Sequence, residues 1–239
     1  MKIAILGCSY SNWWDANIFN ESVPALIAKD NANITMYDAS IGGSGNNSLY
    51  LRVKNIEKNF GSLDKVIVQL TTINRSSIML SKKAIKELGN WKKQHNYHYI
   101  DGTTPYWIML TQGKLKSDDF RKQWETLFPL NSSLDYLHSY NKTFDPYFQT
   151  QQQIDLLNYK YGKENVLFYS WFKENKKLIE LPSNYIGSVQ KQFGIKMNKF
   201  KIDNEYHFNN HGHSAVYRWL KPSINKLLAN GDKYVYNDT

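Results

Sequence analysis

The sequence predicts a three-layer α/β/α sandwich in which a mainly parallel sheet lies between two layers of helices. Short runs rich in β-branched residues lack polar alternation, which is typical of strands that are buried on both faces. Segments with apolar residues at helical spacing lie between these runs, and this alternation favours a parallel sheet. The chain has 239 residues, 41% of them hydrophobic, which suits a single domain over residues 1–239.

Five strands are expected, and the last of them has the weakest signal. In chain order they are residues 2–6, 34–37, 65–70, 165–169 and 200–202. Three helices are indicated by apolar residues that recur at helical spacing. These residues are Phe19, Val23, Leu26 and Ile27 in the first helix, Ile154, Leu157 and Tyr159 in the second, and Ala215, Val216, Trp219 and Leu220 in the third.

The stretch from about residue 75 to 145 interrupts this order, because it is rich in Trp, Tyr and Phe and shows no clear strand. A crossover between parallel strands needs only a dozen or more residues, so much of this stretch is surplus to the sheet. We expect an aromatic-rich insertion packed over one end of the sheet. Its aromatic residues either form the core of a small helical subdomain or supply a lid or wall that faces substrate.

Composition excludes several classes of protein. The chain has 30 Lys+Arg against 21 Asp+Glu, a net charge of +9, but its basic stretch at residues 82–93 is interrupted by Glu87 and no nucleic-acid motif is present. A nucleic-acid partner is therefore not favoured. The single Cys8 excludes an intramolecular disulfide framework and a cysteine-based zinc site. No apolar run is long enough for a membrane span or a signal peptide, and the oligomeric state is not predicted.

Two loops that follow expected strands carry candidate functional residues. In open α/β sheets, ligands bind beyond the carboxyl ends of the strands, near the switch in strand order. Ser9 follows the first strand and Gly7, although this evidence alone favours an N-cap, the usual role of Ser at such a place. The small-residue loop after the second strand contains Ser40, Gly43 and Asn46, and glycine there permits close approach to a ligand. We expect Gly43 and Asn46 to bind substrate; the loop matches neither a P-loop nor a dinucleotide fingerprint.

Two further segments complete the set. Asn74 follows the third strand and presents an amide donor to the same crevice. His207 follows a short acidic turn that contains Asp203, and a neutral imidazole oriented by a carboxylate is a usable general base. The spacing of His207, His211 and His213 matches no familiar zinc pattern, so no metal and no other cofactor is expected.

Together these blocks resemble the SGNH hydrolases, also called the GDSL esterase and lipase family, over most of the chain outside the insertion. The family block Gly-Asp-Ser reads GCS at residues 7–9, and the block that supplies a backbone donor reads DASIGG at residues 38–43. The Asn of the third block is Asn74, and the last block matches at four positions: His207, Asn209, Gly212 and His213.

The resemblance implies a flavodoxin-like sheet and a serine hydrolase. Ser9 is then the nucleophile and His207 the general base, and the oxyanion is held by the backbone N–H groups of Ser9 and Ser40 and by the amide of Asn74. The blocks GCSYS, IGGSGN and LTTINR also resemble the version of this family found in tailed phages. Together with the lack of a signal peptide, this leads us to expect a cytoplasmic or virion-associated protein.

One departure from the family concerns the carboxylate that orients the histidine. The family places an Asp three residues before the His, where this chain has Asn204, and Asp203 lies one residue further back. Either Asp203 reaches His207 through a shifted turn, or Asn204 takes the role. We expect Asp203, because an ionised partner stabilises the imidazolium better than an amide does.

The expected reaction is hydrolysis of an ester, with removal of an acetyl or other short acyl group from a carbohydrate as the preferred substrate class. The aromatic insertion suits stacking on sugar rings, but it also suits an acyl chain. The alternative is a catalytically degenerate binding protein of the same fold, whose crevice or basic surface holds a glycan or a nucleic acid.

Overall fold

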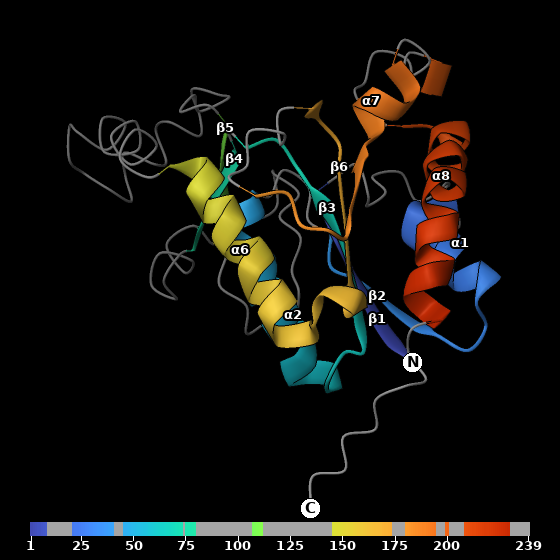
Figure 1. Cartoon of the computed structure of the whole chain (residues 1–239), viewed down its shortest axis with the longest axis horizontal. Helices are drawn as coiled ribbons and strands as arrows, with labels where there is room; N and C mark the ends of the chain where they lie inside the picture. The colour runs from blue at the N-terminus through green and yellow to red at the C-terminus, as the bar shows by residue number, and fades with distance from the viewer. Residues whose placement is uncertain are drawn as a thin grey trace, which may run out of the picture.

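The central feature of the fold is a five-stranded parallel sheet (Figure 1). The computed structural model describes residues 1–8, 21–40, 45–73, 145–173, 180–194, 199–200 and 208–229, together with the backbone of residues 75–79 and 107–111. The sheet has the order β2-β1-β3-β6-β7. Its strands are β1 (Lys2–Leu6), β2 (Thr35–Asp38), β3 (Lys65–Leu70), β6 (Val166–Ser170) and β7 (Tyr185–Ser188).

The order of the strands locates the switch point of the sheet. After β1 the chain adds β2 on one side of it, and then β3, β6 and β7 follow in turn on the other side. The reversal therefore falls between β1 and β3, which are neighbours with Leu6 opposite Val68. In sheets of this kind the ligand crevice lies outside the carboxyl ends of the strands at that point.

The sheet buries both of its faces, as its uninterrupted apolar runs predict. Alternate side chains of β1 point to opposite sides: Ile3 and Ile5 join one buried cluster, and Ala4 and Leu6 join the other. Helices α1 (Val23–Asp30) and α8 (Asn210–Ala229) cover the first face, and α2 (Leu49–Phe60) and α6 (Pro146–Tyr161) cover the second (Figure 1). The predicted three-layer α/β/α sandwich with a parallel sheet is confirmed.

The helices begin and end at residues suited to those positions. Ser22 caps α1 by accepting a hydrogen bond from the Ala25 N–H, and Asp145 caps α6 by accepting one from the Tyr147 N–H. A proline stands in the first turn of each, where its missing N–H costs no helical bond. Helix α6 ends at Gly162, whose φ of 79° favours glycine.

One acidic side chain on each face ties the covering helices together. On the first face, Asp30 of α1 accepts hydrogen bonds from Tyr217 and Lys221 of α8, each at 2.6 Å. These two bonds hold the pKa of Asp30 below its usual value. On the second face, Glu57 of α2 pairs with Lys160 of α6 and accepts a hydrogen bond from the neighbouring Tyr161.

The predicted fifth strand is wrong. Phe200 lies in a short helical turn, residues 201–202 fall outside the described part of the chain, and the fifth strand is β7 at Tyr185–Ser188. An edge strand needs little apolar character, and most of β7 is only half-buried. The strand is also short and contains Gly187, which weakens its signal in the sequence.

Tyr159 is a second correction, because it is 92% exposed instead of lying on the buried face of its helix. Ile154 and Leu157 are fully buried and set the inward direction of α6. Tyr159 lies two residues beyond Leu157, which at about 100° per residue turns it to the far side of the helix.

The insertion also departs from expectation, since it contains strands. Strand β4 (Arg75–Met79) pairs with β5 (Trp107–Thr111) in an antiparallel two-stranded sheet. Strand β4 lies beside the short helical turn η2 (Asn46–Ser48), and the remainder of the predicted insertion falls outside the described residues.

Candidate functional site

The candidate site lies where the chain leaves β1, β2 and β3, next to the switch in strand order. The structure describes Ser40 and Asn46 among the predicted site residues, whereas Ser9, Gly43, Asn74, Asp203, Asn204 and His207 fall outside the described ranges. It does describe three of their chain neighbours: Cys8, Ile73 and Phe208. All three are at most 2% exposed, so each is a fixed point from which the chain reaches a predicted site residue.

The peptide unit between Gly7 and Cys8 is held from two sides. Its carbonyl oxygen accepts a hydrogen bond from Nη1 of Arg52 on α2 at 2.7 Å. Its N–H donates to Oε1 of Gln69 on β3 at 3.1 Å. Because a peptide unit is planar, these two bonds fix the orientation of the chain immediately before Ser9.

Arg52 also reaches the loop after β2. The same Nη1 atom donates to the carbonyl oxygen of Ala39 at 2.9 Å, so one nitrogen joins the segments that lead into Ser9 and Ser40. Arg52 is 3% exposed, and burial lowers its pKa to about 10, while the neighbouring Cys8 and Asp38 oppose that shift. The guanidinium is therefore charged at neutral pH.

Ser40 is nearly buried, and its N–H is engaged. It donates to Oδ1 of Asp38 at 2.9 Å, which closes a tight turn at the end of β2. Burial by the surrounding protein raises the pKa of Asp38 to about 6. Its hydrogen bond with Ser40 and the charge of Arg52 limit the rise.

Asn46 serves the interior in this structure. Its Oδ1 accepts from the Thr71 N–H at 2.8 Å, and its Nδ2 donates to the Thr71 carbonyl at 3.2 Å and lies 3.4 Å from Oγ1 of Thr150. Asn46 is 2% exposed. It therefore fixes the chain that leaves β3 toward Asn74, and a direct contact with substrate would require these bonds to break.

The residues that follow His207 are fixed by a helix cap and by close packing. Asn209 caps α8, because its Oδ1 accepts from the Gly212 N–H at 3.0 Å. Phe208 packs edge-on against Trp171, which follows β6, with 4.5 Å between ring centroids. A Cβ at Gly212 would lie 2.6 Å from the Phe208 ring, so glycine provides the space for that ring.

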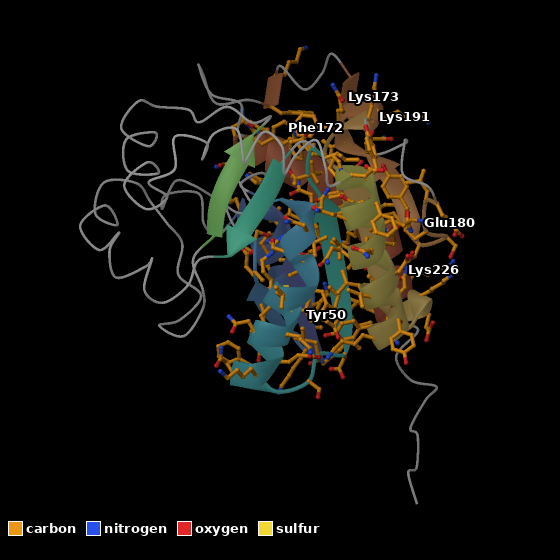
Figure 2. The ribbon with its side chains drawn as sticks, turned by 90° about the vertical axis from the view of Figure 1, so that its left-hand side faces the viewer. Tyr50, Phe172, Lys173, Glu180, Lys191 and Lys226 are labelled. Carbon is orange, nitrogen blue, oxygen red and sulfur yellow. The ribbon has the colours of Figure 1, made fainter. Side chains whose placement is uncertain are left out.

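The described rim at the end of β6 carries positive charge. Lys173, which follows β6, and Lys191 on α7 (Val189–Phe193) lie at the same end of the molecule (Figure 2). The two segments are joined by a hydrogen bond from the Lys173 N–H to Gln190, and both lysines are exposed. Within the described residues, no group of three or more His, Cys, Asp and Glu side chains is arranged to hold a metal.

Sequence reasoning missed Arg52 and Gln69. A signal for each was present, because Arg52 shares the buried helix face of Leu49, Val53 and Ile56, and Gln69 interrupts the apolar run of β3. A polar residue at a core position is the pattern that indicates an internal polar contact.

No protein-family model and no curated protein sequence matches this chain. Several solved structures are similar to it, including EstA and TesA. The psychrotrophic esterase EstA from Pseudoalteromonas sp. has a TM-score of 0.47 and 11% identity, and the match covers 96% of this chain and 99% of that one. TesA has a TM-score of 0.42 and 10% identity, with 95% and 99% covered. Because both TM-scores lie below 0.5, the fold assignment depends on this chain's own sheet. No helix within the described residues is long and apolar enough to cross a membrane.

Proposed function

We propose that this protein is a serine esterase of the SGNH type, with Ser9 as nucleophile and His207 as general base. One observation carries the proposal: Cys8 and Phe208, the chain neighbours of Ser9 and His207, belong to the same buried cluster although 200 positions separate them. Consecutive Cα atoms lie about 3.8 Å apart, so Ser9 and His207 each follow or precede a residue of the same buried cluster by that distance.

The reaction is a two-step acyl transfer. His207 takes the proton of Ser9 as its oxygen attacks the ester carbonyl, and the leaving alcohol then takes that proton from His207. Water, activated by His207 in turn, releases the acyl group from Ser9. Backbone N–H groups of Ser9 and Ser40 and the amide of Asn74 stabilise the oxyanion. Ser40 joins this set once its N–H is released by the Asp38 carboxylate, which holds it at 2.9 Å in the structure described here.

The orienting group is proposed to be Asp203. Asp203→Asn is expected to lower turnover by about 10⁴-fold with little change in folding, because the role is selection of the histidine tautomer. If Asn204 fills the role instead, Asp203→Asn will leave turnover unchanged and Asn204→Asp will raise it. The two variants together therefore identify the partner of His207.

The proposed substrate is a carbohydrate ester with an acetyl or other short acyl group. The aromatic content of residues 75–145 supports it, and strand β4 of that stretch lies beside η2 next to the site. Parallel assays with acetylated glycans, short nitrophenyl esters and lipids test the preference. Activity confined to long acyl chains would contradict it. The phage-type variant of the family and a virion location stay predictions from the sequence.

A fluorophosphonate probe followed by intact-mass analysis tests the central proposal. The wild type is expected to gain the mass of one phosphonyl group, and Ser9→Ala is expected to gain none. Ser183→Ala, which changes an exposed serine in the loop before β7, is the matched control and should label as the wild type does. A wild type that takes up no probe but binds nucleic acid in a salt-sensitive manner would favour the binding-protein alternative.

A further inference from the structure

We propose that Arg52 is a positioning residue of this site, one that holds the segment leading into Ser9 against the segment that carries Ser40. The inference rests on the proposed function, because it assigns Arg52 a role in that chemistry without contact with substrate. It concerns a residue on α2, a helix that contributes none of the predicted catalytic groups.

One nitrogen of Arg52 binds both segments. Nη1 of Arg52 donates to the carbonyl oxygens of Gly7 and Ala39 at 2.7 and 2.9 Å. The Gly7 carbonyl shares a planar unit with the Cys8 N–H, and the Ala39 carbonyl shares one with the Ser40 N–H. Arg52 therefore sets the direction of both peptide units relative to each other, including that of the N–H proposed to stabilise the oxyanion.

Arg52 works with a partner, Gln69, that binds the same peptide unit from the opposite side. Gln69 accepts the Cys8 N–H at 3.1 Å and also contacts Sγ of Cys8 at 3.4 Å. Arg52 comes from a helix on one face of the sheet, whereas Gln69 comes from β3 and contacts Cys8, which belongs to the buried cluster of the other face. Two buried side chains therefore hold the peptide unit that precedes Ser9, one from each side.

The burial of Arg52 is energetically costly. A buried guanidinium loses its hydration, and the charge of Asp38 offsets only part of that loss, because within the described part of the chain Arg52 forms no close ion pair with a carboxylate. An apolar residue of similar volume is often as stable or more stable at such a place. A costly side chain whose hydrogen bonds, among the described residues, join the two site-bearing segments is better explained by the geometry it imposes than by stability.

The experiment compares Arg52→Met, Arg52→Lys and Arg218→Met in the full chain. Arg218 is an exposed arginine on α8 and serves as the matched control. Arg52→Met is expected to lower the fluorophosphonate labelling rate by about 10²-fold, the effect of misplacing a reacting group by about 1 Å. For a nitrophenyl acetate substrate, kcat should fall while KM changes little, because Arg52 does not touch substrate.

Arg52→Lys supplies the rescue. The contact uses a single nitrogen instead of a bidentate fork, so a lysine ammonium can donate to both carbonyls. Its labelling rate should exceed that of Arg52→Met by about tenfold or more, because such a point contact does not need the planar guanidinium. Arg218→Met should match the wild type.

Cys8 provides a readout that is independent of activity. It is the lone cysteine and is fully buried, so its reaction with a chromogenic disulfide reagent reports opening of this segment. Far below the unfolding temperature, the thiol should react faster in Arg52→Met than in the wild type and in Arg218→Met. A folded Arg52→Met protein with wild-type labelling and wild-type thiol protection would overturn the inference.

Failure of the proposed function and failure of the inference about Arg52 give different results. If the wild type takes up no probe at Ser9, the proposed function fails, and Cys8 protection still shows whether Arg52 grips the segment. If Arg52→Met does not fold, Gln69→Leu tests the same segment, because it removes the hydrogen bond that Gln69 accepts from the Cys8 N–H. Faster Cys8 reaction and slower Ser9 labelling in Gln69→Leu would then support the inference, and unchanged values of both would overturn it.

Discussion

Replacing Gly212 by alanine tests the close packing of Gly212 against Phe208, the residue that follows His207. The added Cβ would lie 2.6 Å from Cγ, 2.7 Å from Cδ2 and 2.8 Å from Cβ of Phe208. Ordinary contact begins at 3.4 Å, so the two residues must separate by about 0.8 Å. Because Cβ of Phe208 is itself too close, rotation of the ring alone cannot relieve the contact. The backbone at residue 208 must move, and His207 moves with it.

The magnitude follows from two opposing effects. Overpacking of this size costs about 1–3 kcal/mol, and the ring cannot retreat freely because it packs against Trp171 at 4.5 Å and Phe200 at 5.8 Å. Alanine in a helix returns up to about 1 kcal/mol relative to glycine. We expect a net loss of about 1–2 kcal/mol, which for a chain of this size lowers Tm by roughly 2–8 °C.

Thermal and urea unfolding of Gly212→Ala measure the stability, with Ser214→Ala on the same helix as the control. A double-mutant cycle with Phe208→Ala isolates the contact, because that change removes two of the three close atoms. The coupling is expected to reduce the cost of the added methyl group by about 1 kcal/mol. Ester turnover should also fall by about 10²-fold through displacement of His207. A Gly212→Ala protein as stable as the wild type would refute the reasoning.

Three further predictions concern other parts of the molecule. Asn46→Ala should lower the free energy of unfolding by about 1–3 kcal/mol, because Thr71 loses its buried partner, and an unchanged urea midpoint would contradict this. The pKa of Asp30 is lowered by its hydrogen bond with Lys221. The ionised Asp30 therefore stabilises the fold fully above its pKa in the unfolded chain, and this stabilisation disappears as pH falls through its pKa in the folded protein. The difference in urea midpoint between wild type and Asp30→Asn should be constant near neutrality and vanish in strong acid. Asn74→Ala should lower kcat by about 10²- to 10³-fold if its amide stabilises the oxyanion, and unchanged turnover would remove it from the mechanism.

The sequence by itself determined the layers of the fold and predicted, without a test so far, which loops carry its chemistry. Strands β1 and β3 match the predicted runs residue for residue, and β2 and β6 are displaced by one position. The central runs are readable because a strand buried on both faces is apolar over most of its length. Asn209 and Gly212 stood out in the sequence only through their match to the family block, and the structure shows that one caps α8 and the other makes room for the Phe208 ring.

Tertiary structure alone decided the roles of the polar residues around the site. Asn46 reads as a ligand-binding residue in a small-residue loop, yet its amide is used by Thr71, a partner 25 positions away. Arg52 and Gln69 interrupt apolar patterns, but nothing in those patterns shows that both grip the peptide unit before Ser9. The residue type sets the chemistry of a side chain. Its hydrogen-bond partner depends instead on which distant backbone groups the sheet and helices bring within about 3 Å of it.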